Sequence, residues 1–313
     1  MPRRAVCCTI KGDQPLLVST MRVWGTVVIE KAVRAARDRF LIGPIARSRL
    51  VQRHAHFAYD YSLKKMGDHT IAYDPRDRGA IGSHLTRYGE WCRDDFRSIL
   101  SALAKGGRET KGKVFVDVGA NIGTQTVYAL IKDDFASAIS IEPAPGNISL
   151  LDINITLNGL QDRVIVERCA AGPQCERKSL IVNKKDIAIH TFVEKVASVD
   201  DGIKVDVDVL PVDAILQKHC VRPADVGLVL IDVEGFEPDV IAGAPQVIAA
   251  RAPLFVEFNS HVYGRSGTAD LLRLLGKHYT RAYSPATIKG LPAREFDITG
   301  IDDRYLPGDL LFF

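Results

Sequence analysis

The strongest constraint on the fold is an alternation of short apolar runs and helical patterns that starts at Lys113 and continues almost to the end of the chain. Several runs contain or end in an acidic residue, as in 114–118 (VFVDV), 226–232 (VGLVLID) and 254–257 (LFVE). Short strands that alternate with helices indicate a mainly parallel sheet with helices on both faces. Ligands bind such sheets at the carboxyl ends of the strands, so polar residues at these ends are candidates for a site. Residues 205–212 (VDVDVLPV) are expected to add a strand to the same series.

The chain before Lys113 lacks this alternation, so we expect an extension over residues 1–110 and the sheet domain over residues 111–313. Within the helical or irregular extension, EWCRDDFRSILSALAKGG predicts an amphipathic helix that ends at two glycines, and short strands are expected around FAYDY and HTIAY. Up to residue 53, eleven basic residues oppose three acidic ones. Such a segment can contact nucleic acid or an anionic membrane, but the solvated face of a helix is the simpler interpretation.

The cysteines and the hydropathy pattern favour a cytoplasmic protein. The six cysteines form neither a CxxC pair nor a cluster at zinc spacing, which fits reduced thiols. No apolar run reaches the length of about 18 residues that a transmembrane helix needs. Lys11, Gly12 and Asp13 interrupt the apolar stretch behind the basic N-terminus, so we do not expect a secretory signal. Whether Met1 or Met21 is the natural start stays open.

The turn after the first run of the sheet domain, DVGANIG, is typical of a nucleotide-like cofactor site. Gly119 and Gly123 allow a tight turn and close approach of a ligand, but Asn121 stands where the dinucleotide fingerprint GxGxxG has its second glycine. Asp117, expected to face the pocket mouth, would repel a pyrophosphate and attract a cation. S-adenosylmethionine carries an ammonium and a sulfonium and no phosphate, so this turn suits it better than NAD. A plain strand-to-helix turn is the non-functional alternative.

A second acidic residue supports an adenosine ligand. Glu142 ends the next run, 19 residues after Gly123, and Pro143 fixes the turn that follows. A carboxylate at this place in a Rossmann-like unit accepts hydrogen bonds from both ribose hydroxyls. NAD would use the same group, so Glu142 does not choose between the two cofactors.

Acidic residues at two later strand ends are candidates for catalysis. Asp232 and Glu257 would face the same cleft if their strands are neighbours, as a general base and a substrate clamp or as ligands of a divalent cation. Glu237 precedes a proline at a predicted helix start, which indicates a capping role. His190 and His261 have the right ordinary pKa for a base, although a single histidine is more often structural.

Five segments resemble the FkbM family of S-adenosylmethionine-dependent methyltransferases when they are taken in order. The similarity extends over residues 80–260, leaves the first 55 residues outside, and rests on VDVGANIGTQT, IEPAPGNISLLDINITLNGL, VLPVDAIL, LIDVEGFEPDVIAGA and PLFVEFN. It implies a class I methyltransferase fold, an α/β Rossmann-like sheet of seven mostly parallel strands in which the last strand, here the final LLFF, is antiparallel. It makes residues 111–313 the S-adenosylmethionine-binding domain, and we expect part of residues 1–110 to cover the active site.

The resemblance also implies a reaction and a set of contacts. The reaction is O-methylation of a hydroxyl on a sugar, glycolipid, polysaccharide or polyketide-type molecule. Glu142 would bind the ribose with Pro143 beside it, Asp232 would contact the cofactor, and Glu234 would edge the reaction site. The methionine end of the cofactor would lie against the turn that contains Asp117, Gly119, Ala120, Asn121 and Gly123. The segment ERCAAG offers the adenine only backbone groups or packing, from Cys169 and Ala170.

In the mechanism expected from these residues, a substrate oxygen attacks the sulfonium methyl group in line, and Asp232, or else Glu257 or His190, accepts its proton. Four aromatic residues of the extension would either stack on a sugar ring or belong to the core: Tyr59, Tyr61, Tyr88 and Trp91. An NAD-dependent oxidoreductase and a catalytically inactive scaffold are the alternatives. A nucleic-acid substrate is disfavoured because IDVEG lacks the Asn/Asp-Pro-Pro-aromatic pattern. The acceptor, a requirement for metal and the oligomeric state stay open.

Overall fold

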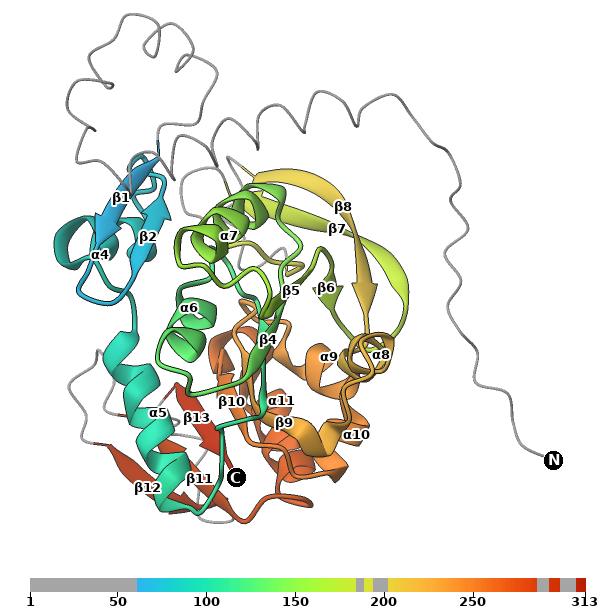
Figure 1. The fold of residues 1–313 in the computed structure, drawn as a ribbon. Helices are drawn as coiled ribbons and strands as arrows, with labels where there is room; N and C mark the ends of the chain where they lie inside the picture. The colour runs from blue at the N-terminus through green and yellow to red at the C-terminus, as the bar shows by residue number, and fades with distance from the viewer. Residues whose placement is uncertain (1–60, 184–188, 194–201, 286–292, 299–307) are drawn as a thin grey trace, which may run out of the picture. The chain divides into compact units, whose positions relative to one another are not determined.

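A computed structural model describes residues 61–183, 189–193, 202–285, 293–298 and 308–313, which all belong to one compact unit, Tyr61–Phe313 (Figure 1). Its main feature is an eight-stranded sheet in the order β12-β11-β13-β10-β9-β3-β4-β5. The strands are β3 (Val114–Val118), β4 (Ser137–Ile141), β5 (Val164–Glu167), β9 (Val226–Ile231), β10 (Leu254–Glu257), β11 (Arg281–Ser284), β12 (Arg294–Asp297) and β13 (Asp309–Phe312). The basic segment up to residue 53, Met21 and Tyr59 lie outside the described residues.

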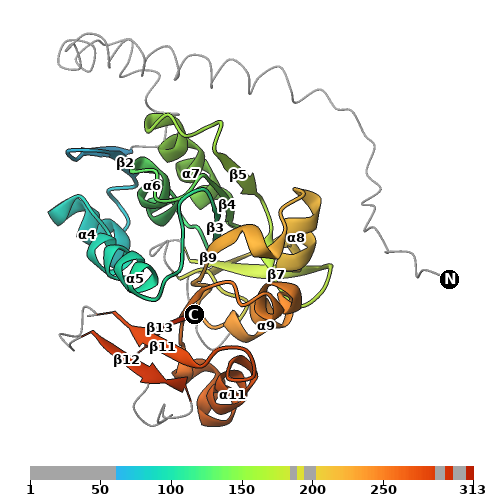
Figure 2. The same ribbon diagram turned by 60° about the horizontal axis from the view of Figure 1, so that its bottom comes forward.

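The predicted α/β class is confirmed, with one strand more than the seven expected for the sheet. The strands β10, β9, β3, β4 and β5 pair in parallel, whereas β13 runs antiparallel to both β10 and β11. The strands β11, β12 and β13 lie together near α11 (Figure 2). The additional strand β12 (REFD) pairs only with β11 at the sheet edge and is mostly exposed, so it lacks the apolar run that marks the inner strands.

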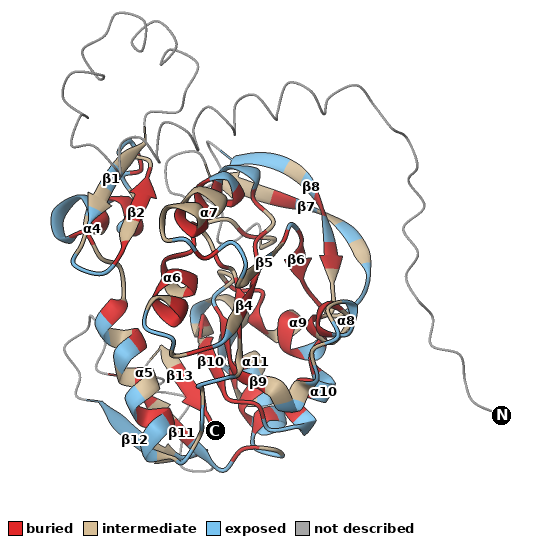
Figure 3. Cartoon of the chain, viewed as in Figure 1, coloured by how far each residue is buried: buried red, intermediate tan, exposed pale blue. Residues whose placement is uncertain are grey.

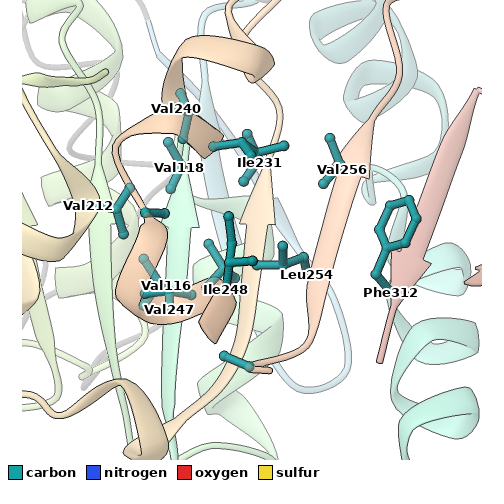
Figure 4. Close-up of a cluster of buried hydrophobic side chains, with 14 of the residues drawn as sticks. Val116, Val118, Val212, Ile231, Val240, Val247, Ile248, Leu254, Val256 and Phe312 are labelled. Atoms are coloured by element: carbon teal, nitrogen blue, oxygen red, sulfur yellow. The ribbon is translucent and has the colours of Figure 1, made fainter. Parts of the chain in front are cut away.

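Helices cover both faces of the sheet because successive side chains of each strand point to opposite sides. On one face, Phe115 packs with α5 (Arg93–Lys105), α6 (Thr124–Ile131) and α7 (Pro145–Leu157). On the other face, Val116 and Val118 join a core that Figure 4 shows in part. That core is built with α8 (Val212–Lys218), α9 (Glu237–Ala242), α10 (Pro245–Ala249) and α11 (Ser260–Leu275). The buried residues therefore concentrate along the sheet and the inner sides of the helices (Figure 3).

The described part of the extension packs on this core with its side chains and is also hydrogen-bonded to it through the backbone of one strand. The predicted helix is confirmed as α5, and HTIAY forms β2 (Thr70–Tyr73), which pairs with β1 (Ser62–Lys65) and precedes α4 (Ala80–Tyr88). The strand expected at FAYDY falls almost wholly outside the described residues. Asn154 of α7 and Asn158, which follows the last residue of this helix, hydrogen-bond to the backbone of β2 at Ala72 and Thr70.

A separate three-stranded sheet corrects one expectation from the sequence. Residues 205–212 do not add a strand to the main sheet, because most of them belong to β8 (Gly202–Leu210). This strand pairs antiparallel with β7 (Glu176–Asn183) and parallel with β6 (Ala170–Ala171). The strict V-D-V-D alternation has the period of a half-exposed strand, which an antiparallel hairpin accommodates better than a sheet covered on both faces. Among the described residues, the helices are too short or too polar to cross a membrane.

Candidate active site

A pocket opens where β3, β4 and β9 end, with an empty volume of about 510 Å³ that includes the part open to solvent. It lies at the carboxyl ends of parallel strands, the place where ligands bind such sheets. The strands β6 and β7 and residues 189–193 form further parts of its wall. The lining residues are Val118, Gly119, Asn121, Ile141, Glu142, Pro143, Asn147, Ala170, Ala171, Leu180, His190, Phe192, Asp232, Val233, Glu234 and Phe236.

The glycine turn fits tightly between neighbouring strands. Gly119 has φ +85°, and a Cβ atom added there would lie 1.8 Å from the carbonyl oxygen of Asp232. Gly123 has φ +84°, and a Cβ atom there would lie 2.4 Å from a methyl carbon of Leu151. Both positions therefore require glycine for backbone conformation and for space. Of the predicted turn contacts, Gly119 and Asn121 line the pocket, whereas Ala120 and Gly123 do not.

The carboxylate of Glu142 is held by the two turns beside it. The Asn121 amide donates to Oε2 and the Ala144 amide donates to Oε1, both at 2.8 Å. Burial raises the pKa of Glu142 to about 7, against the effect of these bonds and of a hydrogen bond with the Asn147 side chain. Each carboxylate oxygen has two acceptor positions, so a ligand in the pocket can still donate to Glu142.

Asp117 lies elsewhere than expected. It is only 1% exposed and is not among the residues that line the pocket, because its side chain points to the face of β3 that carries α6. Thr126 of α6 donates to Asp117 Oδ2 at 2.6 Å and also bonds with Ser140 at 2.7 Å. Burial raises the pKa of Asp117 to about 6. The expected position at the pocket mouth is therefore wrong, and a contact of Asp117 with a cofactor stays a prediction.

Three carboxylates meet beside the pocket. The strands β9 and β10 are parallel neighbours, which is the condition for Asp232 and Glu257 to face the same cleft. They bring Asp232 and Glu257 together with Glu234. One carboxylate oxygen from each lies within 4.8 Å of the others, an arrangement that offers oxygen ligands to a divalent cation. Asp232 is exposed to solvent, yet crowding by protein atoms and then the charges of Glu257 and Glu234 raise its pKa well above the ordinary value.

A buried hydrogen-bond network supports this cluster of three acidic residues. Glu237 is fully buried in the first turn of α9, and its Oε1 accepts the amide of Gly235 in the preceding loop at 2.9 Å. This bond does not cap the helix, so the capping role stays a prediction. The Asn259 side-chain amide donates both to Glu237 Oε1 at 3.1 Å and to Glu257 Oε2 at 2.8 Å. Asn259 thereby fixes the carboxyl group of Glu257, one of the three acidic residues.

The segment at residues 189–193 brings the predicted residue His190 and the unpredicted residue Phe192 to the pocket, with the unpredicted Thr191 between them. His190 lines the pocket as a base candidate would, and its Nδ1 accepts the Asn183 amide at 3.2 Å. Phe192 lines it too and packs against Phe236, with ring centres 5.0 Å apart. Between them, Thr191 donates to the carbonyl oxygen of Glu234 at 2.8 Å. No sequence signal marked Thr191 or Phe192, because their partners lie more than 40 residues away.

Other candidates lie outside the pocket lining. His261 is exposed, and the described aromatics Tyr61, Tyr88 and Trp91 are not lining residues. Tyr61 and Trp91 pack against the core on the α5 face, which is the structural alternative for these residues. Ala170 lines the pocket where adenine packing was expected, and Cys169 is buried without lining it.

Comparison with known proteins gives one match to a family. Residues 117–282 match the model of the methyltransferase FkbM domain, and a search of curated proteins finds no match. Among solved structures, methyltransferase FkbM from Methylobacillus flagellatus KT is 20% identical with a TM-score of 0.43. The alignment covers 66% of this chain and 44% of that one, so the chain spans less than half the length of that relative. TYW2 from P. horikoshii in complex with MeSAdo is 11% identical with a TM-score of 0.40 and coverages of 82% and 70%. The M. jannaschii tRNA m1G37 methyltransferase is 14% identical with a TM-score of 0.37 and coverages of 82% and 54%.

Proposed function

The chain belongs to the FkbM methyltransferase family, and on this premise we propose that it is an enzyme that transfers the methyl group of S-adenosylmethionine to a hydroxyl group. The acceptor we propose is a sugar, glycolipid, polysaccharide or polyketide-type molecule, as the resemblance of the sequence motifs implies. The cofactor would occupy the pocket at the ends of β3, β4 and β9.

One observation carries this proposal, the charge of the pocket. Three acidic side chains line it, those of Glu142, Asp232 and Glu234, although the pKa values of Glu142 and Asp232 are raised, and the described lining residues include neither lysine nor arginine. A pyrophosphate would bring further negative charge into this wall, whereas the sulfonium and ammonium groups of S-adenosylmethionine would be attracted. The pocket therefore favours S-adenosylmethionine over the alternative of NAD.

The contacts that we propose follow the geometry. Glu142 would accept hydrogen bonds from the ribose hydroxyls, since the amides of Asn121 and Ala144 already orient its carboxylate. The turn at Gly119–Gly123 and Asp232 would lie along the methionine end. Ala170, beside the apolar wall of Leu180 and Phe192, would pack against the adenine.

For the transfer itself, we propose Asp232 as the general base. The cofactor would supply the methyl group to an acceptor oxygen and leave as neutral S-adenosylhomocysteine, and the Asp232 carboxylate would take the hydroxyl proton. A raised pKa suits this role because a base works best when its pKa lies near the operating pH. Glu257 would hold the acceptor or share the proton. His190 is less suited, because its Nδ1 already accepts a backbone amide and its proton then resides on Nε2, where it can donate.

A divalent cation would fit between the same three acidic residues. Asp232, Glu234 and Glu257 supply the hard oxygen ligands that Mg²⁺ prefers, and a bound cation would lower the pKa of an acceptor hydroxyl. Asp232 would then act as a ligand and not as the base. A dependence of turnover on Mg²⁺ distinguishes these two roles.

The deciding experiment is calorimetric titration of the protein with S-adenosylmethionine and S-adenosylhomocysteine, with and without Mg²⁺, and fluorescence titration with NADH for comparison. We expect both sulfur compounds to bind at micromolar concentrations and NADH not to bind. Binding of NADH alone would replace the proposal with an oxidoreductase. The absence of binding to all three ligands would favour an inactive scaffold. After a positive result, a screen of sugar and polyketide alcohols with labelled cofactor identifies the acceptor.

A further inference from the structure

Thr191 connects the β7–β8 hairpin to the loop after β9, which contains Asp232 and Glu234. It is 1% exposed, and its backbone exchanges two hydrogen bonds with Ile181 of β7, at 3.0 and 3.2 Å. Its hydroxyl donates to the carbonyl oxygen of Glu234 at 2.8 Å and accepts the amide of Val193 at 3.0 Å. One buried side chain therefore joins the wall that carries His190 to the loop that follows β9.

The loop needs such a connection because its backbone is in an unfavourable conformation. Glu234 has φ +52°, in the left-handed region that residues with a side chain seldom adopt, and Gly235 follows with φ +97°. A non-glycine residue in this region persists only when its surroundings hold it. Two contacts that contribute are the hydrogen bond from the Thr191 hydroxyl to the Glu234 carbonyl oxygen and the hydrogen bond from the Gly235 amide to Glu237 Oε1.

We infer that Thr191 is a positioning residue that fixes the direction of the Glu234 carboxylate in the cofactor pocket. Glu234 lines the pocket together with Asp232, so its charge lies where the sulfonium group of S-adenosylmethionine is proposed to bind. The inference rests on the proposed function. If the loop relaxes from its left-handed conformation, the Cα–Cβ bond of Glu234 turns and the carboxylate leaves this position.

The effect of this charge can be measured with two forms of the cofactor by binding alone, with no acceptor substrate present. S-adenosylmethionine has a positive sulfur, and S-adenosylhomocysteine has a neutral one. A carboxylate held beside the sulfur therefore favours the first ligand and leaves the second almost unaffected. The ratio of the two dissociation constants measures the position of the Glu234 charge, and a general loss of stability does not change it.

Thr191→Val removes the hydroxyl and keeps the shape and both backbone bonds to Ile181. We expect it to weaken S-adenosylmethionine binding by about three- to tenfold, as for the loss of one hydrogen bond, and S-adenosylhomocysteine binding by less than about twofold. Thr191→Ser should restore the ratio of the wild type. Thr191→Ala removes the same hydroxyl with less bulk, so a folding defect in one variant does not decide the result.

A double-mutant cycle with Glu234→Gln tests whether Thr191 acts through Glu234. In that background, Thr191→Val should leave the ratio of the dissociation constants unchanged. Ser179→Ala is the matched control, because it deletes a hydroxyl bonded to Asp206 at 2.5 Å on the same hairpin and outside the pocket lining.

The outcomes separate the inference from the proposed function. If the wild type binds both ligands, and if Thr191→Val and Thr191→Ala have the same ratio of dissociation constants as the wild type, the positioning role is wrong and the methyltransferase proposal stands. An equal change of the ratio with and without the Glu234 charge also overturns it. If the wild type binds neither ligand, the proposed function fails and the inference falls with it.

Discussion

Asp232 directly follows β9 and Glu257 ends the adjacent parallel strand β10, and a carboxylate oxygen of each lies within 4.8 Å of the other. Crowding by protein atoms and then the nearby charges of Glu257 and Glu234 disfavour the ionised form of Asp232, so its pKa lies well above the ordinary value. Asp232 therefore retains a proton at a pH at which an isolated aspartate is ionised.

This relationship predicts the pH dependence of methyl transfer. If Asp232 is the base, activity requires its deprotonated form, so kcat/KM should rise with pH through the raised pKa of Asp232. Glu257→Gln removes the charge of Glu257, which helps to raise that pKa, so we expect the variant to move this limb of the profile to lower pH. The pH profile of the two proteins, measured with a chelator present, checks this. An unshifted limb would show that the pair does not control the reaction.

Asp232→Asn should lower turnover by about 10²–10⁴-fold, the usual contribution of a general base, since an amide cannot accept the proton. The cofactor dissociation constant should change by only a few-fold, because the variant keeps the size of the side chain. Single-turnover rates with labelled cofactor, together with calorimetric binding, check both statements. Asp206→Asn, on the exposed face of β8, serves as the control and should behave like the wild type. Unchanged turnover in Asp232→Asn would remove Asp232 as the base.

Glu142→Ala should weaken cofactor binding by about 1.5–3 kcal/mol, roughly 10- to 150-fold, because hydrogen bonds to a charged group are lost. A suitable control is Glu167→Gln at the end of the neighbouring strand β5. Glu167 bonds with Lys218 and His219 and does not line the pocket, so its removal should leave affinity unchanged. Calorimetry of both variants measures the difference. Equal affinities in the wild type and Glu142→Ala would exclude the ribose role.

The sequence predicted those parts of the site that depend on local pattern. A strand that ends in an acidic residue places that residue at the carboxyl edge of a parallel sheet, which located Glu142, Asp232 and Glu257. The direction of Asp117 was predicted wrongly, because its position near the strand end did not show which face its side chain would take. In the structure, Phe115 and Asp117 share the α6 face, and Val118 reaches the pocket.

The remaining parts depend on contacts between distant segments. Thr191 meets Glu234 only because β7 and β8 form a hairpin beside the main sheet, and a period-two pattern does not say which sheet a strand joins. The edge strand β12 is likewise too polar to be recognised as a strand from its sequence. Polar side chains that replace backbone partners, such as Asn154, also give no periodic signal.

Gly119→Ala should destabilise the protein far more than an ordinary glycine substitution. The added methyl group meets the Asp232 carbonyl at 1.8 Å and the residue has φ +85°, so the turn must move away from β9. Gly112→Ala is the matched control, since Gly112 has φ +79° and open space around it. We expect a loss of about 3 kcal/mol or more in the free energy of unfolding for the first variant, and about 1 kcal/mol for the second. Urea denaturation measures both. Similar losses would mean that backbone conformation, and not the contact with Asp232, sets the requirement for glycine.

Asn154→Ala should weaken the attachment of β2 to the sheet domain. The fully buried side-chain amide of Asn154 accepts the Ala72 amide at 2.6 Å and donates to the carbonyl oxygens of Ala72 and Ile122 at 3.1 and 2.7 Å. Alanine leaves three backbone groups without partners, so the free energy of unfolding should fall by about 2–4 kcal/mol.

Asn158→Ala provides the comparison for this prediction, because Asn158 makes the same pair of bonds to Thr70 in a half-buried position that water can reach. It should cost about 1 kcal/mol. Hydrogen exchange adds a local measurement, since the Ala72 amide should lose its protection in Asn154→Ala, while amides in the centre of the sheet follow only the change in global stability. If Ala72 stays as protected as those amides, then packing of β2 on α7, and not the asparagine side chain, holds the extension in place.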